Sequence, residues 1–314
     1  MAFFHVALVS LAATVTVLTA AVAPAQPVIS TVDVTRFYAL YASTGGHPTA
    51  EELQRDYIDV GSGGLHRLAT ERRVTGASIA ANLAKHPEEY MNAKRCMVVL
   101  PNVRMRLLTV FQTYVTLYPQ AQFPPITIAV SRGKPAGIAD ESGVIIGLEA
   151  LCGVQWMNPN MEERFVHIIT HEYTHVQQAL ANPTFYNEAN PTLLDRSLAE
   201  GAAEFMAELA SGESGELAYG DFASRTRGHE LAIDKAFVAD ENSTDLSNWI
   251  DNSTVTTCGD LGYWVGYRIV KSYYEHAANK RQAVSDIIQM NDPKAFLAAS
   301  GWYPGIDIAI VRIE

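Results

Sequence analysis

The chain has 314 residues, of which 48% are hydrophobic and 18% are charged, a composition typical of a globular protein with a sizeable core. Its 23 Lys and Arg residues against 34 Asp and Glu give a formal net charge of −11. This charge argues against binding to nucleic acid or to an anionic membrane surface, because either partner attracts a basic face.

The first 25 residues differ from the rest. They contain no Asp, Glu, Lys or Arg, and Ala23 and Ala25 place small residues at the −3 and −1 positions of a cleavage site. This pattern predicts a secretory signal peptide over residues 1–25, and hence an exported protein, periplasmic or extracellular. An uncleaved N-terminal anchor is the alternative. No later stretch has the roughly 20 apolar residues of a membrane helix, so we expect no stable membrane span after cleavage.

The first half of the mature chain is predicted to contain helices followed by two strands. Residues 26–95 have mainly helical patterns, and apolar residues at helical spacing predict a helix over 102–118. Alternating or continuous apolar residues predict strands over 126–130 and 143–148, joined by a loop that carries Gly133, Pro135 and Gly137.

The second half is predicted to be helical almost to the end. Asn160 followed by Glu163 indicates the start of a helix that runs to about residue 181, and further helices are expected over about 190–212, 228–238 and 261–278. No composition break separates these parts, so residues 26–314 are predicted to form a single domain. The fold class is predicted to be α+β, with a small sheet packed on a mainly helical body.

A rare chemical pattern lies in the helix that begins at residue 160. His171-Glu172-Tyr173-Thr174-His175 is an H-E-x-x-H motif, and residues four apart share one face of a helix. His171 and His175 can therefore offer two imidazole nitrogens to one Zn²⁺, with Glu172 beside them as the general base that takes a proton from the attacking water. Two helix-face histidines beside a solvated Glu are the structural alternative.

The following helix offers a third zinc ligand. Catalytic zinc usually has three protein ligands, and Glu200 is the best-placed candidate. Glu204 lies one turn later, where it can hydrogen-bond the far nitrogen of a ligating histidine. The alternative is a solvated acidic stripe of Glu200, Glu204 and Glu208. Gly201 is costly inside a helix, and close approach of the two zinc-bearing helices would explain it.

These motifs resemble the gluzincin metallopeptidases, in which the third zinc ligand is a Glu on the next helix. The resemblance implies a zincin-like fold whose active-site helix carries the H-E-x-x-H motif, with Glu200 as ligand and Glu204 as its acidic neighbour. A closer similarity is to a bacterial domain-of-unknown-function family described as predicted Zn-dependent proteases and related to a gliding-motility lipoprotein. It covers about residues 33–275 and includes these segments: Gly61-Ser62-Gly63-Gly64-Leu65, Gly137–Leu148, Gln177-Gln178 and Gly262-Tyr263-Trp264-x-Gly266-Tyr267.

Peptide hydrolysis also needs a donor for the oxyanion. Tyr263 and Tyr267 are catalytic candidates for this role, although tyrosines on amphipathic helices more often fill the core. The strand at 144–148 would either pair with an extended peptide or lie inside the sheet.

The sequence therefore predicts an exported zinc metallopeptidase with a peptide or protein substrate, which could belong to the cell envelope. A noncatalytic envelope protein that retains the scaffold, or a zinc hydrolase of a non-peptide amide or ester, are the alternatives. Cys96, Cys152 and Cys258 match no zinc or haem spacing, and one pair of them is free to form a disulfide in an oxidising compartment.

Overall fold

A computed structural model describes residues 28–153, 158–212, 226–252 and 259–308. The predicted signal peptide and Cys258 lie outside these residues. The secondary-structure elements are, in chain order, β1 Ile29–Ser30, α1 Val32–Ser43, α2 Ala50–Leu53, a π-helical turn Gln54–Ile58, α3 Gly63–Glu71, α4 Gly76–Lys85, α5 Pro87–Cys96, a 3₁₀ turn Met97–Val99, α6 Leu100–Leu117, β2 Ile126–Ala129, β3 Gly137–Asp140, β4 Gly143–Gly147, α7 Leu148–Gly153, α8 Met161–Ala181, α9 Pro183–Tyr186, α10 Leu193–Ser211, α13 Glu230–Asp240, α14 Leu261–His276, α15 Lys280–Gln289 and α16 Pro293–Ala299.

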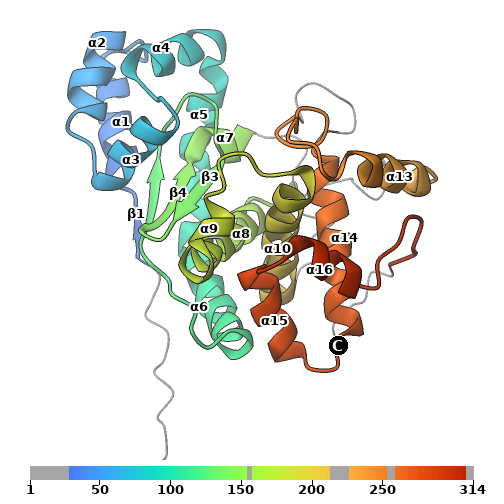
Figure 1. The fold of residues 1–314 in the computed structure, drawn as a ribbon. Coiled ribbons are helices and arrows are strands. Elements are labelled where there is room, and N and C mark those ends of the chain that lie inside the picture. Colours follow the sequence, from blue (N-terminus) through green and yellow to red (C-terminus); the bar gives the residue numbers. More distant parts are fainter. Residues whose placement is uncertain (1–27, 154–157, 213–225, 253–258, 309–314) are drawn as a thin grey trace, which may run out of the picture.

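The fold is α+β, as predicted: a small mixed sheet packs on a mainly helical body (Figure 1). The sheet has the order β1-β2-β4-β3, with β1, β2 and β4 parallel and β3 antiparallel to β4. The two predicted strands correspond to β2 and β4. Strand β3 forms within the segment that was expected to be a loop, because a turn at Asp140–Gly143 folds it back along β4.

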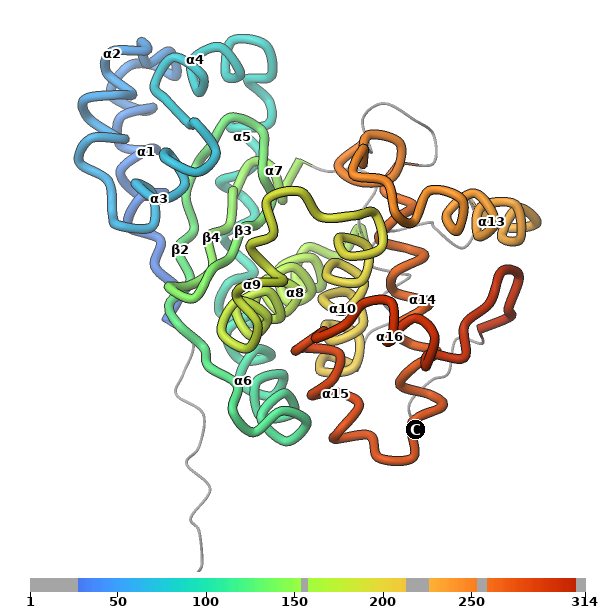
Figure 2. The backbone as a smooth tube through the Cα atoms, in the orientation of Figure 1, coloured from blue at the N-terminus to red at the C-terminus, as the bar shows by residue number. Residues whose placement is uncertain are grey.

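Helices cover both faces of the sheet. Helices α1 and α3 pack against β2 on one face, and α8 packs against β3 and β4 on the other (Figures 1 and 2). The glycine-rich segment before α3 has two roles in this packing. Ser62 accepts a hydrogen bond from Leu65 N and so caps α3, while a Cβ on Gly64 would fall 2.3 Å from Thr127 Oγ1 of β2. Only a glycine allows α3 to lie this close to the sheet.

Helix α10 lies between α8 and α14 and is buried along nearly its whole length. A Cβ on Gly201 would fall 2.1 Å from the carbonyl carbon of Gly266, and one on Gly266 would fall 1.8 Å from Ser197 O. Gly201 therefore serves the crossing of α10 with α14. The sequence attributed this glycine to a close approach of α8 and α10. That expectation was wrong, because the helix that lies against Gly201 is α14.

A disulfide joins Cys96 at the end of α5 to Cys152 in α7, which resolves the pairing that the sequence left open. It fastens the N-terminal helices to the segment that leads into α8. Within the described residues, no helix is both long enough and apolar enough to span a membrane.

Candidate metal centre

Helix α8 carries the H-E-x-x-H motif through the middle of the molecule. Asn160 caps its N-terminus by accepting hydrogen bonds from Glu162 N and Glu163 N. Every residue from Arg164 to Ala179 is buried, including His171, Glu172 and His175. The alternative in which Glu172 is solvated is thus excluded, and the polar groups of this buried helix need partners within the protein.

Three donor atoms from α8 and α10 converge on one point. His175 Nε2 lies 3.1 Å from His171 Nε2 and 3.1 Å from Glu200 Oε2, and His171 Nε2 lies 3.4 Å from the same carboxylate oxygen. Ligands of a tetrahedral zinc ion with bonds of about 2.0–2.1 Å stand about 3.3 Å apart, so this triangle has the size of a zinc coordination face. Two imidazole nitrogens facing each other at this distance also need a cation or a proton between them. Two nitrogens and a carboxylate oxygen form a donor set that suits zinc.

The far nitrogens of both histidines have partners. His175 Nδ1 lies 2.7 Å from Gln178 Oε1, and the Gln178 amide donates to Ala199 O, next to Glu200. His171 Nδ1 lies 2.5 Å from Glu204 Oε1. Gln178 Oε1 can accept the Nδ1–H of His175, which leaves the His175 Nε2 lone pair free, the tautomer that a metal requires. Glu204 Oε1 is an ion-pair partner of His171 Nδ1, although the two atoms do not have the geometry of a hydrogen bond.

The acidic residues of α10 are buried, in contrast to the solvated stripe considered as an alternative. Glu200, Glu204 and Glu208 are 7, 3 and 5% exposed. Each has a basic partner: Glu200 faces His171, His175 and Arg196, Glu204 faces His167 and His171, and Glu208 pairs with Lys271 at 3.0 Å.

Glu172 lies between the donor triangle and the sheet. A Cβ on Gly137, at the start of β3, would fall 2.3 Å from Glu172 Oε1. The backbone of β3 therefore closes one side of the Glu172 carboxylate, which positions it beside the histidines. The H-E-x-x-H motif predicted that Glu172 lies beside a metal ion. Nothing in the sequence indicated that position 137 has to be a glycine.

Without a metal ion, the electrostatics of the centre favour ionised Glu200 and Glu204 carboxylates and a more basic Glu172. Burial opposes ionisation of Glu200 and Glu204, but the neighbouring histidines outweigh it, so the pKa of Glu200 falls well below its usual range and that of Glu204 falls to about 2. Burial would lower the pKa of His171, but Glu204 and Glu200 together raise it. Burial raises the pKa of Glu172 despite the nearby histidines, which makes its carboxylate a stronger base.

The structure separates the two tyrosines named as catalytic candidates. The Tyr267 hydroxyl donates to Glu208 and lies 2.9 Å from Lys271 Nζ, in a buried cluster two helical turns beyond Glu200. Tyr263 lies nearer to the donor triangle, since burial and then the charge of Glu200 raise its pKa.

Two residues of this centre were missed by the sequence reasoning. The Tyr186 ring centroid lies 5.4 Å from that of His175, and its hydroxyl donates to Ala139 O of β3 at 3.3 Å. Arg196 Nη1 lies 3.4 Å from Glu200 Oε1, the oxygen turned away from the histidines. The only sequence signal for Arg196 was its position four residues before Glu200, which places both side chains on one face of α10.

Strand β4 lies inside the sheet between β2 and β3, so it has no free edge for a peptide. The edge strands are the two-residue β1 and, next to Glu172, β3, where Ala139 O already accepts a hydrogen bond from Tyr186. Gly147 N donates to Ala136 O, which directs the backbone groups of Gly137 and Ala139 away from β4.

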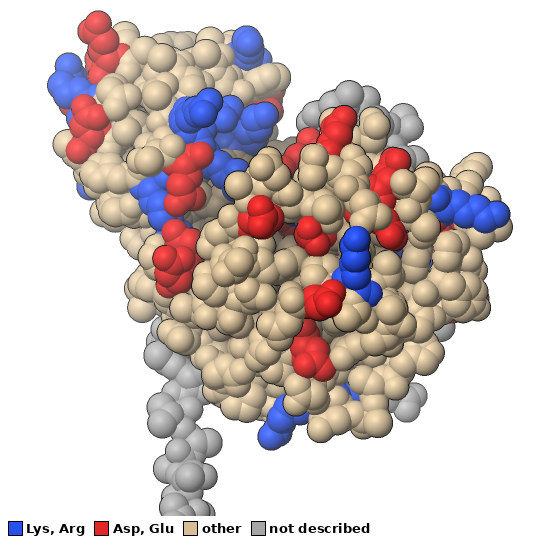
Figure 3. All heavy atoms as spheres, in the orientation of Figure 1, with Lys and Arg blue, Asp and Glu red and all other residues tan. Residues whose placement is uncertain are grey.

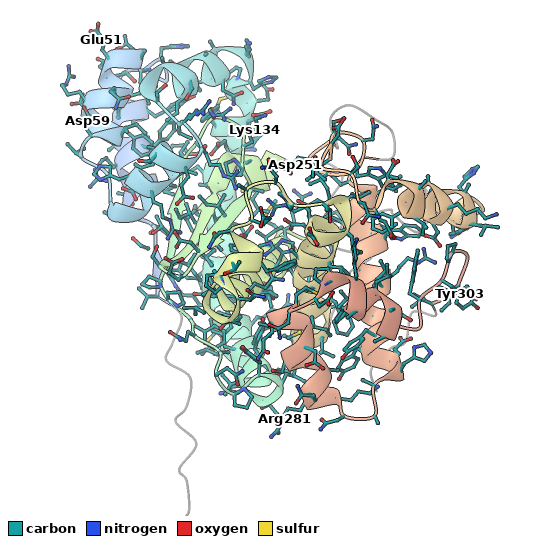
Figure 4. The ribbon with its side chains drawn as sticks, viewed as in Figure 1. Glu51, Asp59, Lys134, Asp251, Arg281 and Tyr303 are labelled. Atoms are coloured by element: carbon teal, nitrogen blue, oxygen red, sulfur yellow. A yellow bond between two sulfur atoms is a disulfide. The ribbon has the colours of Figure 1, made fainter. Side chains whose placement is uncertain are left out.

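On the face of the molecule in Figure 3, basic side chains gather over the N-terminal helices and acidic ones over the C-terminal half. Figure 4 shows Lys134, just before β3, and Asp251 above α8 and α10 in this view.

Comparison with known families fits this geometry. Residues 149–296 match a family described as predicted Zn-dependent protease (DUF2268). The matched segment contains α8, α10 and α14, and with them His171, His175, Glu172 and Glu200. No curated protein and no solved structure matches the chain. The family description supports zinc dependence and a hydrolytic role for the segment, while the relation to a gliding-motility lipoprotein stays a prediction.

Proposed function

We propose that the protein is a zinc-dependent metallopeptidase, with His171, His175 and Glu200 as the metal ligands and Glu172 as the general base. The observation that carries this proposal is the triangle of two imidazole nitrogens and one carboxylate oxygen, all buried and 3.1–3.4 Å apart. The adjacent Glu172 favours catalysis over a structural metal site, because a structural site needs no base beside it.

Zinc bound at this centre would polarise a substrate carbonyl and make an attacking water more acidic. Glu172 then accepts the proton of that water at a carboxylate oxygen and passes it to the leaving amine. Gln178 and Glu204 keep the two histidines in the metal-binding tautomer. Tyr186 is the hydroxyl best placed to stabilise the oxyanion, because it lies against both His175 and β3, and Tyr263 is the next candidate.

We further propose that an extended peptide or protein substrate lies along the outer edge of β3 at Gly137. The backbone groups of Gly137 face this edge and the carboxylate of Glu172 lies directly behind it. A strand added there would bring its peptide bonds past the general base. The proposed setting is outside the cytoplasm, after removal of residues 1–25, with cell-envelope proteins among the substrates.

The test combines metal content with peptide turnover. Mature wild-type protein is compared with Glu172→Gln and Glu200→Ala by elemental analysis and on a quenched peptide library. We expect one zinc per chain in the wild type and in Glu172→Gln, loss of zinc in Glu200→Ala, and a fall in turnover of about 10²–10⁴-fold in Glu172→Gln. Zinc without turnover of any peptide would contradict the peptidase proposal and favour a scaffold or a non-peptide amide or ester substrate.

A further inference from the structure

A second group of donor atoms lies behind the proposed zinc ligands. His167 on α8 and Glu204 on α10 are both buried, and His167 Nε2 lies 3.0 Å from Glu204 Oε2. The other oxygen of the same carboxylate, Oε1, faces His171 Nδ1 at 2.5 Å. Glu204 thus bridges two histidines that are one helical turn apart, and only His171 reaches the donor triangle.

These three residues could themselves hold a metal ion. Their spacing argues against it. Two ligands of one tetrahedral zinc ion stand about 3.3 Å apart, whereas Glu204 Oε1 and His171 Nδ1 lie only 2.5 Å apart, as the two atoms of a direct ion pair. A metal here would also have to share the His171 ring with the first site. A direct ion pair between the two side chains explains the distance without either requirement.

We propose that His167 is a positioning residue that donates its Nε2–H to Glu204 and so holds this carboxylate against His171 Nδ1. This inference rests on the proposed metal centre and extends it by one residue. Without His167, one oxygen of Glu204 loses its donor in a buried position, and the carboxylate turns to find another. His171 Nδ1 then loses its fixed acceptor, and the Nε2 lone pair is no longer held toward the metal.

The test uses two substitutions of similar polarity. Gln places its amide nitrogen close to the position of His Nε2, whereas the shorter Asn side chain does not reach it. The zinc dissociation constants of wild type, His167→Gln and His167→Asn are measured by chelator competition. The visible absorption of the Co²⁺-loaded proteins reports on ligand geometry without reference to turnover. We expect His167→Asn to bind zinc about 10–100-fold more weakly than wild type, with an altered Co²⁺ spectrum, and His167→Gln to remain close to wild type.

A double-substitution cycle tests the route through Glu204. If His167 acts through this carboxylate, His167→Asn adds little to the loss already caused by Glu204→Gln. His66→Phe, a histidine of α3 outside the cluster, is the control and should bind zinc as the wild type does. The metal-free proteins are compared by thermal unfolding, and any variant that does not fold is left out of the comparison.

The outcomes separate this inference from the proposed function. Wild-type protein that binds no zinc contradicts the metal centre itself. Wild-type protein that binds one zinc, together with equal affinities in His167→Asn and wild type, overturns the role of His167 alone. Two metal ions per chain, with one lost in His167→Asn, would show that the His167–Glu204 cluster is a second metal site and would also overturn the proposal.

Discussion

Gly137 and Glu172 approach each other so closely that a methyl group at position 137 would overlap the Glu172 carboxylate, 2.3 Å from Oε1. Strand β3 and helix α8 thus meet at a residue without a side chain, and backbone confines the carboxylate of Glu172, the proposed general base.

The first prediction follows from this contact. In Gly137→Ala the Glu172 carboxylate has to move by about an ångström, so we expect kcat to fall about 100-fold while zinc content stays at one per chain. Peptide turnover and elemental analysis measure the two effects. Gly63→Ala is the matched control, because a Cβ at position 63 meets no atom within 4 Å. Full activity in Gly137→Ala would show that β3 does not position Glu172.

Gln178 is predicted to matter for metal affinity through His175. Gln178→Leu removes the acceptor of His175 Nδ1–H and the hydrogen bond to Ala199 O, so we expect zinc to bind about 10–100-fold more weakly. Chelator competition measures the change. Gln177 is the neighbouring control: its amide bonds Gln122 and Tyr173, so Gln177→Leu should reduce stability and leave zinc affinity unchanged.

The tyrosines around the centre are predicted to differ in function. Tyr186→Phe removes the hydroxyl of the ring that packs against His175, and we expect kcat to fall by about 10–100-fold with little change in zinc affinity. Tyr267→Phe removes a hydroxyl bonded to Glu208 and Lys271, so it should lower the melting temperature and leave kcat unchanged. The reverse result would place the oxyanion donor on α14.

Glu149 is predicted to make stability depend on pH. Burial raises the pKa of this carboxyl from 4.5 to about 7, although Ser131 N and Gly133 N donate to it and lower the value. Because the folded-state pKa is the higher one, the folded protein binds the proton more tightly. The contribution of Glu149 to stability is therefore complete below pH 4.5 and is lost as the pH rises through 7.

The size of this effect is about 3.5 kcal/mol at most, from a shift of 7 − 4.5 = 2.5 pKa units at roughly 1.4 kcal/mol per unit. Urea unfolding of wild type and Glu149→Gln at several pH values measures it. The stability of the wild type relative to Glu149→Gln should fall between about pH 4.5 and pH 7. A constant difference across this range would contradict the prediction.

Gly201 is predicted to be essential for stability. The Cβ of Gly201→Ala would lie 2.1 Å from the backbone of Gly266, and backbone cannot move aside as a side chain can. We expect a loss of about 3 kcal/mol or more in the free energy of unfolding, because α10 and α14 must separate. Denaturant unfolding of the metal-free protein checks this, and an unchanged midpoint would show that the helices adjust.

Much of this architecture could be predicted because it depends on local pattern. The Asn160 cap and the apolar spacing indicated α8, and the H-E-x-x-H motif identified the side chains that converge in the structure. The distance along the chain from His175 suggested Glu200, which the structure places against both histidines.

Other features depend on long-range contacts that a sequence does not display. Strand β3 forms only because β4 is beside it, and its glycine and proline residues indicated a loop. Tyr186 comes from a short helix, and nothing in its local pattern distinguishes it from a surface tyrosine. Tyr267 was predicted as an oxyanion donor because the sequence does not show that Lys271, one turn along α14, pairs with Glu208. Its hydroxyl contacts this buried pair instead.

The Cys96–Cys152 disulfide crosses the N-terminal boundary of the family match at residue 149. A cut anywhere between these two cysteines would leave two fragments that migrate as one species on a gel until a reductant is added. The helices that precede the matched segment therefore remain attached to the half that contains the candidate metal centre, even after a nick in the loop before β3.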